Sequence, residues 1–391
     1  MTHKIPSRRE LVGRASELAP LLRKNALWEE ENRRLPDEVV DALTESGLLN
    51  LRVPTRYGGY ECDMRTVVEV IAELGRGDGS TAWVMSVFAI STWMAGLFPD
   101  EVQDEVFAQP GVRVSGILSP TATAVPVDGG VLLNGKWGFN SGVLHSSWDT
   151  NAAVLMSPDG PQPVMAAVPT ADLEIVDDWH TAGLRGSGSV STVARDVFVP
   201  EARVLPMGPV LQGVHRSRAN ADSPVFNAPF MPTACATISA PALGLAKAAK
   251  DAFLERLPGR KITYTAYENQ SEAPLTHLQV AKAVTGIDEA EFHALRAADL
   301  IDAHALDGTP WTLEERARVR LDLGATCVRA KEAVDVLNGA SGGSSVFTDV
   351  PIQRIERDVQ TLNLHAILHP DTNFELYGRI VCGLEPNTLY L

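Results

Sequence analysis

Histidines and glycine-rich turns are the first places in this sequence where residue type and spacing could support chemistry. His365 and His369 stand four residues apart with Asp371 nearby, a spacing that can place two metal ligands on one helix face. Pro370 interrupts a helix at that point and no third ligand follows at helical spacing, so we expect no metal site. The segment GLRGSGS (183–189) approaches a dinucleotide fingerprint, but it lies between β-like segments. The strand-to-helix context of that fingerprint is missing, so we expect no nicotinamide domain.

A second candidate is the segment GKWGFNSGVLHSSW (135–148), in which Ser141 and Gly142 lie between two tryptophans. A serine hydroxyl both donates and accepts a hydrogen bond without adding charge, which suits it to a neutral cofactor edge. Taken alone, Ser141-Gly142 is best explained as a plain turn between strands. His145 in the same segment could serve only as a structural hydrogen-bonding group.

The elements that must position these residues change in type along the chain. Apolar residues at helical spacing predict helices over 8–24, 36–48, 64–77 and 80–97. Short β-rich runs separated by Gly, Pro and Asp then predict an antiparallel sheet or small barrel, ending in a Pro-rich loop over 200–230. Long amphipathic helices return over 241–257 and 311–337, a pattern typical of a bundle. We therefore predict an N-terminal α-helical domain (1–112), a central β domain (113–210) and a C-terminal helical bundle (211–391).

Composition excludes several classes of protein. The chain has 391 residues, with 34 Lys and Arg against 49 Asp and Glu, for a formal net charge of -15. Such an acidic surface disfavours nucleic acid and anionic membranes as partners. The four cysteines form no C-x-x-C pair, and the N-terminus does not resemble a signal peptide. The sequence has no run of 18 or more apolar residues, so we expect no membrane span. These features predict a cytoplasmic protein.

Four segments, in the expected order, resemble the acyl-CoA dehydrogenase fold family. They are LPDEVVDALTESGLLNLRVPTRYGGYECD (35–63), WHTAGLRGSGSVSTVARDVFVP (179–200), PALGLAKAAKDAF (241–253) and GASGGSSVFTDVPIQRIERD (339–358). The resemblance covers nearly the whole chain. It implies an α+β fold, with N-terminal helices, a central β-barrel or sandwich, and a C-terminal four-helix bundle.

Two chemistries occur on this fold. Dehydrogenases place a carboxylate base in a Tyr-Glu-Gly-Thr turn after the Arg-Asp of the last bundle segment. Here His365-Ala366 occupies the Tyr-Glu place, and a methyl group cannot remove a proton. Glu255 on an earlier helix could act as a displaced base, so an acyl-CoA dehydrogenase stays an alternative.

The second chemistry is that of two-component flavin monooxygenases. The segment 135–148 resembles their pattern G-x-W/F-x-x-x-S-G-x-x-H-x-x-W. The resemblance implies that reduced flavin (FADH₂, or else FMNH₂) arrives from a separate NAD(P)H:flavin reductase and reacts with O₂ to a C4a-(hydro)peroxyflavin. It places Ser141 at the N5/C4a edge of the flavin and His365 over flavin and substrate. Such a site must exclude water.

The resemblance also implies a set of cofactor-binding residues. Trp137 and Trp179 would form apolar walls, and Ser119 would bond the pyrimidine edge of the flavin. The remaining candidates are polar or glycine residues at turns and bundle ends: Arg185, Ser187, Arg260, Gly343 and Arg354. For each of these a structural role, as a core aromatic, turn, ion-pair partner or helix cap, is the alternative. The bundle implies a homotetramer, or at least a dimer, with flavin sites between subunits.

Ser91 stands where phenol-oxidising members carry a histidine that faces the substrate. Serine is a poor base for a phenolic proton, so we expect a substrate that is activated in itself, such as an indole-like ring. An amine that undergoes N-oxygenation is a further alternative. A flavin-binding scaffold without catalysis is the non-enzymatic one.

Overall fold

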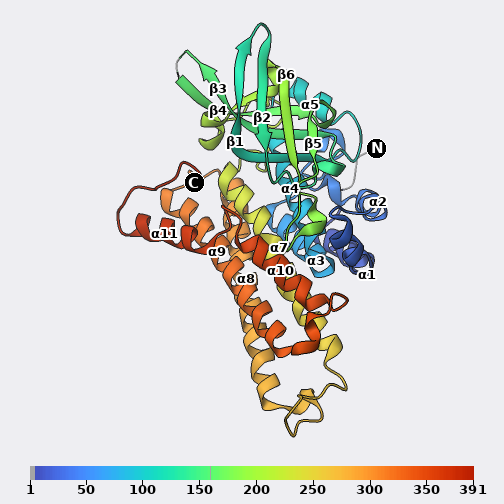
Figure 1. Ribbon diagram of the computed structural model, residues 1–391. Coiled ribbons are helices and arrows are strands. Elements are labelled where there is room, and N and C mark those ends of the chain that lie inside the picture. The colour runs from blue at the N-terminus through green and yellow to red at the C-terminus, as the bar shows by residue number, and fades with distance from the viewer. Residues whose placement is uncertain (1–4, 159) are drawn as a thin grey trace.

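The computed structural model describes residues 5–158 and 160–391 and consists of helices, a sheet and further helices in chain order (Figure 1). Within this described part, no helix combines the length and apolarity needed to cross a membrane. The N-terminal helices are α1 (Arg8–Asn32), α2 (Asp37–Glu45), α3 (Met64–Gly77), α4 (Gly79–Ala95) and α5 (Asp100–Val106). The helices predicted over 8–24, 36–48, 64–77 and 80–97 are thereby confirmed.

Side-chain caps fix where the two central N-terminal helices begin. The Asp63 carboxylate accepts from the backbone N–H of Thr66 at the start of α3, and Asp78 accepts from Thr81 at the start of α4. Every residue of α4 except Ile90 is buried. A helix that is apolar on all sides belongs in a core, and α4 packs against α7 on one side and strand β1 on the other.

The central sheet has seven strands in the order β5-β6-β2-β1-β3-β4-β7. They are β1 (Val114–Val127), β2 (Gly130–Trp137), β3 (Trp148–Ser157), β4 (Gly160–Pro169), β5 (Glu174–Val176), β6 (Ser191–Pro200) and β7 (Val204–Pro206). The sheet is mixed rather than antiparallel throughout, because β1 and β3 pair in parallel. The segment predicted as a loop over 200–230 also contains β7 and the short helix α6 (Met207–Leu211).

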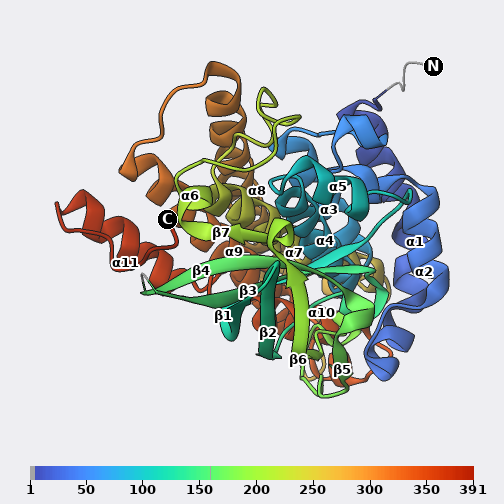
Figure 2. The same ribbon diagram turned by 90° about the horizontal axis from the view of Figure 1, so that it is seen from above.

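The C-terminal helices are α7 (Phe230–Arg256), α8 (Pro274–Asp307), α9 (Leu313–Ala340), α10 (Pro351–Asn363) and α11 (Pro370–Val381). The helix predicted over 241–257 begins 11 residues earlier, at Phe230, and Pro241 lies inside it without ending it. The helix predicted over 311–337 is confirmed. Viewed from above, the sheet lies over part of the helical layer, with α1, α2 and α11 visible beside it (Figure 2). The domain limits at 112 and 210 stay a prediction.

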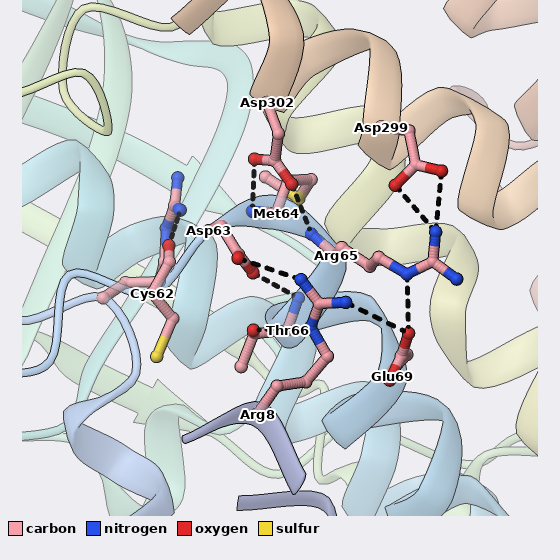
Figure 3. A network of polar contacts seen from close by, with 10 residues as sticks. Arg8, Cys62, Asp63, Met64, Arg65, Thr66, Glu69, Asp299 and Asp302 are labelled. Carbon is pink, nitrogen blue, oxygen red and sulfur yellow. Dashed lines mark hydrogen bonds and ion pairs between the residues drawn. The ribbon is translucent and has the colours of Figure 1, made fainter. Parts of the chain in front are cut away.

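Polar contacts at the start of α3 join the N-terminal helices to α8 (Figure 3). The Asp302 carboxylate accepts from the backbone N–H groups of Met64 and Arg65 at 2.7 and 3.0 Å. The Arg65 guanidinium pairs with Asp299 at 2.7 Å. Farther along, α3 crosses α7 so closely that a Cβ on Gly244 would lie 2.3 Å from the Ala72 carbonyl oxygen. These contacts fix α3, and with it α4, against the bundle.

Candidate functional site

Four side chains from three separate segments form a buried chain of hydrogen bonds. The Trp83 indole N–H of α4 donates to Ser141 Oγ at 2.8 Å. Ser141 Oγ lies 2.6 Å from Ser189 Oγ, which lies 2.7 Å from Ser187 Oγ. The chain ends where Ser187 donates to the Leu184 carbonyl oxygen at 2.6 Å. Ser141 and Ser187 are predicted site residues that the structure brings together, while Trp83 and Ser189 were missed.

Two glycine-containing turns hold this chain in place. Gly142 has φ +76, which glycine adopts without strain, and a Cβ there would lie 2.7 Å from the Phe88 ring. The Gly142 N–H donates to the Ser187 carbonyl at 3.2 Å, which ties the turn after β2 to the loop before β6. Leu184 adopts φ +50, a strained value for a residue with a side chain. Ser141-Gly142 is therefore a turn, and it is also part of the hydroxyl chain.

Aromatic rings surround the hydroxyl chain. The Trp83 and His365 rings meet edge to face at 5.3 Å. Phe139 stands edge-on to Trp179 at 5.8 Å, and the Trp179 indole N–H donates to the Leu184 carbonyl at 3.1 Å. Phe139 has φ +62 and is 72% exposed, an unusual state for a large apolar residue. A strained, exposed aromatic next to a buried polar chain indicates a surface prepared for an apolar, planar ligand.

His365 is a neutral imidazole in this setting. Burial lowers the pKa of His365 to about 4, so it carries no charge at neutral pH. The backbone N–H of Ile367 donates to its Nδ1 at 3.3 Å. That contact makes Nδ1 the acceptor and leaves the proton on Nε2. His365 can therefore donate one hydrogen bond from Nε2 to a bound molecule.

Three buried carboxyl groups lie behind the loop that carries Leu184. Asp358 of α10 accepts from the Leu184 N–H at 2.6 Å. Burial, and then the neighbouring Asp78, raise the pKa of Asp358 to about 7. Burial, and again Asp78, also raise the pKa of Glu29 well above its usual range. The charged groups facing this cluster from the packed helices are Glu30, Arg185, Arg354 and Arg357, around a cavity of about 10 Å³ that could hold one water molecule.

The other predicted catalytic and ring-binding residues lie elsewhere on the sheet side. Ser91 of α4 is buried, and a Cβ on Gly116 would lie 2.8 Å from its hydroxyl and 2.3 Å from that of Thr150. Ser119 is exposed, at the break in register of β1. Trp137 has no exposed surface and donates to the Ala152 carbonyl at 2.8 Å, so it belongs to the core of the sheet.

The predicted arginines fall into two groups. Arg185 donates to the main-chain carbonyls of Glu30 and Thr181, both at 2.8 Å, and shares the small cavity with Arg354. Arg260 instead donates to the Ser341 carbonyl, beside Gly343. It belongs to the connection between α7 and α8, which lies at the end of the bundle far from the sheet (Figure 1). Within a single subunit, Arg260 therefore lies apart from Arg185 and Arg354.

The structure shows the surroundings of Glu255 and His145, whose roles the sequence left open. Glu255, the candidate displaced base, is 65% exposed and pairs with Arg23 at 3.3 Å. It is thus a surface ion pair in this chain. Burial lowers the pKa of His145 to about 4, and Arg113 donates to its backbone carbonyl. In the part of the chain that the structure describes, no group of three or more His, Cys, Asp or Glu is arranged to bind a metal ion.

Comparisons with known proteins show which family the chain belongs to. The acyl-CoA dehydrogenase N-terminal domain model matches residues 14–110, and the C-terminal domain model matches residues 236–370. The flavin-dependent monooxygenase oxygenase subunit HsaA of Mycobacterium tuberculosis is 34% identical over 373 residues, which cover 94% of each chain. The chain belongs to the flavin-dependent monooxygenases of the acyl-CoA dehydrogenase fold.

Two further similar proteins, a hydroxylase component and a solved structure, match this chain over nearly its whole length. The FADH₂-dependent resorcinol hydroxylase, oxygenase component, of Rhizobium sp. is 31% identical and covers 97% of this chain and 96% of its own. XiaF from Streptomyces sp., solved with FADH₂ and glycerol, is 34% identical with a TM-score of 0.91 and covers 97% of both chains. The predicted α+β fold and the flavin-dependent monooxygenase class are confirmed.

The residues present fit a flavin ring. Phe139 and Trp179 offer apolar surface, and the hydroxyl of Ser141 offers a polar contact beside it. The neutral His365 adds a donor without adding charge. This arrangement offers a planar aromatic cofactor an apolar surface with one hydrogen-bond donor beside it.

Proposed function

We propose that this protein is the oxygenase component of a two-component system that hydroxylates a small aromatic or heteroaromatic molecule, such as an indole. It would use FADH₂, with FMNH₂ as the alternative, from a separate NAD(P)H:flavin reductase acting with it in the cytoplasm. The observation that carries the proposal is the hydroxyl chain at Ser141, two residues from Phe139, whose backbone is strained and whose ring is exposed. The identities of two relatives, an oxygenase subunit and a resorcinol hydroxylase component, support it.

When bound, the reduced flavin activates O₂ and supplies the oxygen atom. Ser141 would hold the N5/C4a edge of the ring, and Phe139 and Trp179 would cover the ring against water. Neutral His365 would orient the substrate through Nε2–H and hold or pass one proton there. Because the His365 pKa is about 4, this proton stays available throughout the neutral pH range.

Ser91 supports a substrate that needs no ionisation. Its neighbours are the Gly116 backbone and the Thr150 hydroxyl. None of these three residues carries a side chain that can act as a base. Phenol hydroxylation gains from a base that removes the phenolic proton, whereas an electron-rich indole ring reacts as it stands. We therefore propose that Ser91 contacts the substrate as a neutral hydroxyl.

The remaining cofactor residues would act at a distance from the ring edge. Trp137 would support the wall from inside the sheet, Ser119 would bond the pyrimidine edge, and Ser187, Arg185 and Arg354 would anchor the loop beneath it. Arg260 and Gly343, at the far end of the bundle, would reach the flavin of a neighbouring subunit. That arrangement requires at least a dimer, and we propose a homotetramer.

Incorporation of oxygen from ¹⁸O₂ tests the proposed function. The protein would be mixed with FAD, NADH, a flavin reductase and a panel of indoles and simple phenols. We expect one ¹⁸O atom in an indole product, and less product from Ser141→Ala. A matched control is Ser239→Ala, which removes a buried hydroxyl in α7 that donates to the Ala236 carbonyl. Absence of ¹⁸O from every product, with reduced flavin supplied, would refute the proposal.

A further inference from the structure

We propose that Ser189 and Ser187 fix the direction of the hydroxyl chain, so that Ser141 faces the ligand only as a hydrogen-bond acceptor, and that this makes the site select reduced over oxidised flavin. The inference rests on the proposed function, which places the flavin N5 edge at Ser141. The proposed function already takes the flavin in its reduced form, and the inference adds the two residues that determine this preference.

The direction of the chain follows from its carbonyl end. A carbonyl oxygen only accepts, so the Ser187 proton points to Leu184 at 2.6 Å. Ser187 has no second proton, so Ser189 must donate across the 2.7 Å contact between them. Ser189 has then used its own proton, and Ser141 must donate across the remaining 2.6 Å contact. Each hydroxyl donates toward Leu184.

The other end of the chain agrees with this direction. The Trp83 indole nitrogen only donates, and at 2.8 Å it fills one lone pair of Ser141 Oγ. The Ser141 proton has one competing acceptor, the Phe139 carbonyl, at the longer distance of 3.4 Å. Using it would leave the Ser187 and Ser189 oxygens in contact at 2.7 Å without a proton between them. Donation from Ser141 to Ser189, in the direction of Leu184, is therefore the stable arrangement.

The loop that carries the terminal carbonyl is held from both sides. The Leu184 carbonyl also accepts from the Trp179 indole N–H at 3.1 Å, and the Leu184 backbone N–H donates to the Asp358 carboxyl group. Gly183 lies against α10, where a Cβ would come within 2.2 Å of the Arg357 carbonyl oxygen. The carbonyl therefore cannot turn away easily, and the direction it imposes is built into the fold.

This direction leaves Ser141 with one lone pair and no proton for a ligand. Reduced flavin carries hydrogen on N5 and can donate to that lone pair. Oxidised flavin has a lone pair on N5, and two acceptors in contact repel each other. One hydrogen bond gained against one mismatch corresponds to a difference of about tenfold in affinity.

Binding of the two redox states, measured without turnover, tests this inference. FAD would be titrated into the protein under anaerobic conditions, once oxidised and once reduced by dithionite, with equilibrium dialysis as the readout. We expect the wild type to bind reduced FAD about tenfold more tightly or better. Ser189→Ala removes the acceptor of the Ser141 proton, which frees that proton to donate to N5 of oxidised FAD. Its ratio should fall by about tenfold, mainly through tighter binding of the oxidised form.

Three further variants separate this role from a merely structural one. Ser187→Ala should lower the ratio in the same direction, because Ser189 can then turn its proton to Ser141. Ser141→Ala should also lower it, because the reduced form loses its acceptor and the oxidised form loses the repulsive contact. Ser239→Ala should change neither affinity. A wild type that binds both forms equally, or a folded Ser189→Ala protein with an unchanged ratio, would overturn the inference and leave the proposed function standing. Failure of the wild type to bind either form would refute the proposed function itself.

Discussion

Asp358→Asn should make the protein more stable at alkaline pH. Asp358 is 3% exposed, and burial followed by the Asp78 carboxylate raises its pKa to about 7. In the unfolded chain an aspartate titrates near ~3.9, so the shift spans about three pH units. At ~1.4 kcal/mol per unit, ionised Asp358 costs the native state up to about 4 kcal/mol.

The sign follows from the raised pKa. Below pH ~4 both states hold the proton and no penalty exists. As the pH rises toward about 7, the unfolded state releases the proton first, and the stability that Asp358 contributes when protonated is lost. Asparagine keeps an oxygen that can accept from the Leu184 N–H and does not titrate. The free energy of unfolding of the variant, relative to wild type, should therefore increase by about 2–3 kcal/mol between pH 5 and pH 8.

Urea unfolding at fixed protein concentration and ionic strength, at each pH from 5 to 8, measures this difference. Asp299→Asn is a matched control, because the Asp299 side chain is 52% exposed and pairs with Arg65 at the surface. Its difference from wild type should stay nearly constant over the same range. If the Asp358→Asn and wild-type curves run parallel between pH 5 and pH 8, Asp358 does not titrate as the buried cluster requires.

Three other changes give measurable outcomes. Gly142→Ala should lower the free energy of unfolding by at least about 2 kcal/mol in urea melts, because φ is +76 and the new methyl would meet Phe88; a loss below 0.5 kcal/mol would contradict the geometry. Ser141→Ala should release several-fold more H₂O₂ per reduced flavin in a peroxidase-coupled assay, and an unchanged yield would remove Ser141 from the site. Because the His365 pKa is about 4, the coupling of flavin oxidation to product should be flat from pH 6 to 8, whereas a step near pH 6.5 would show a charged imidazole.

The sequence was sufficient for the order of the elements. Apolar spacing predicted the helices at 8–24 and 64–77, and β-rich runs predicted the strands, because these signals are local. The parallel pairing of β1 with β3 was not predictable in the same way, since it depends on which strands meet in space. Likewise Pro241 did not end α7, because tertiary packing outweighs the local cost.

The site was predicted in part. Family resemblance predicted Ser141, Ser187, Trp179 and His365 as site residues. The structure places them around one loop, and their contact with flavin stays a prediction. Trp83 was missed because it lies 58 residues before its partner Ser141 and looks like any apolar residue of a buried helix. Ser189, 48 residues after Ser141, stood within the glycine-rich segment 183–189, but only the fold reveals that its hydroxyl faces Ser141.

The central claim is that this protein receives reduced flavin and controls its reaction with O₂. Its most direct test is stopped-flow mixing of the protein, loaded anaerobically with FADH₂, with oxygenated buffer, while the 450 nm absorbance of oxidised flavin is followed. We predict that this absorbance appears markedly later than for free FADH₂, and that an indole substrate diverts oxygen into product. Reoxidation at the rate of free FADH₂, with all of the oxygen recovered as H₂O₂, would contradict the account.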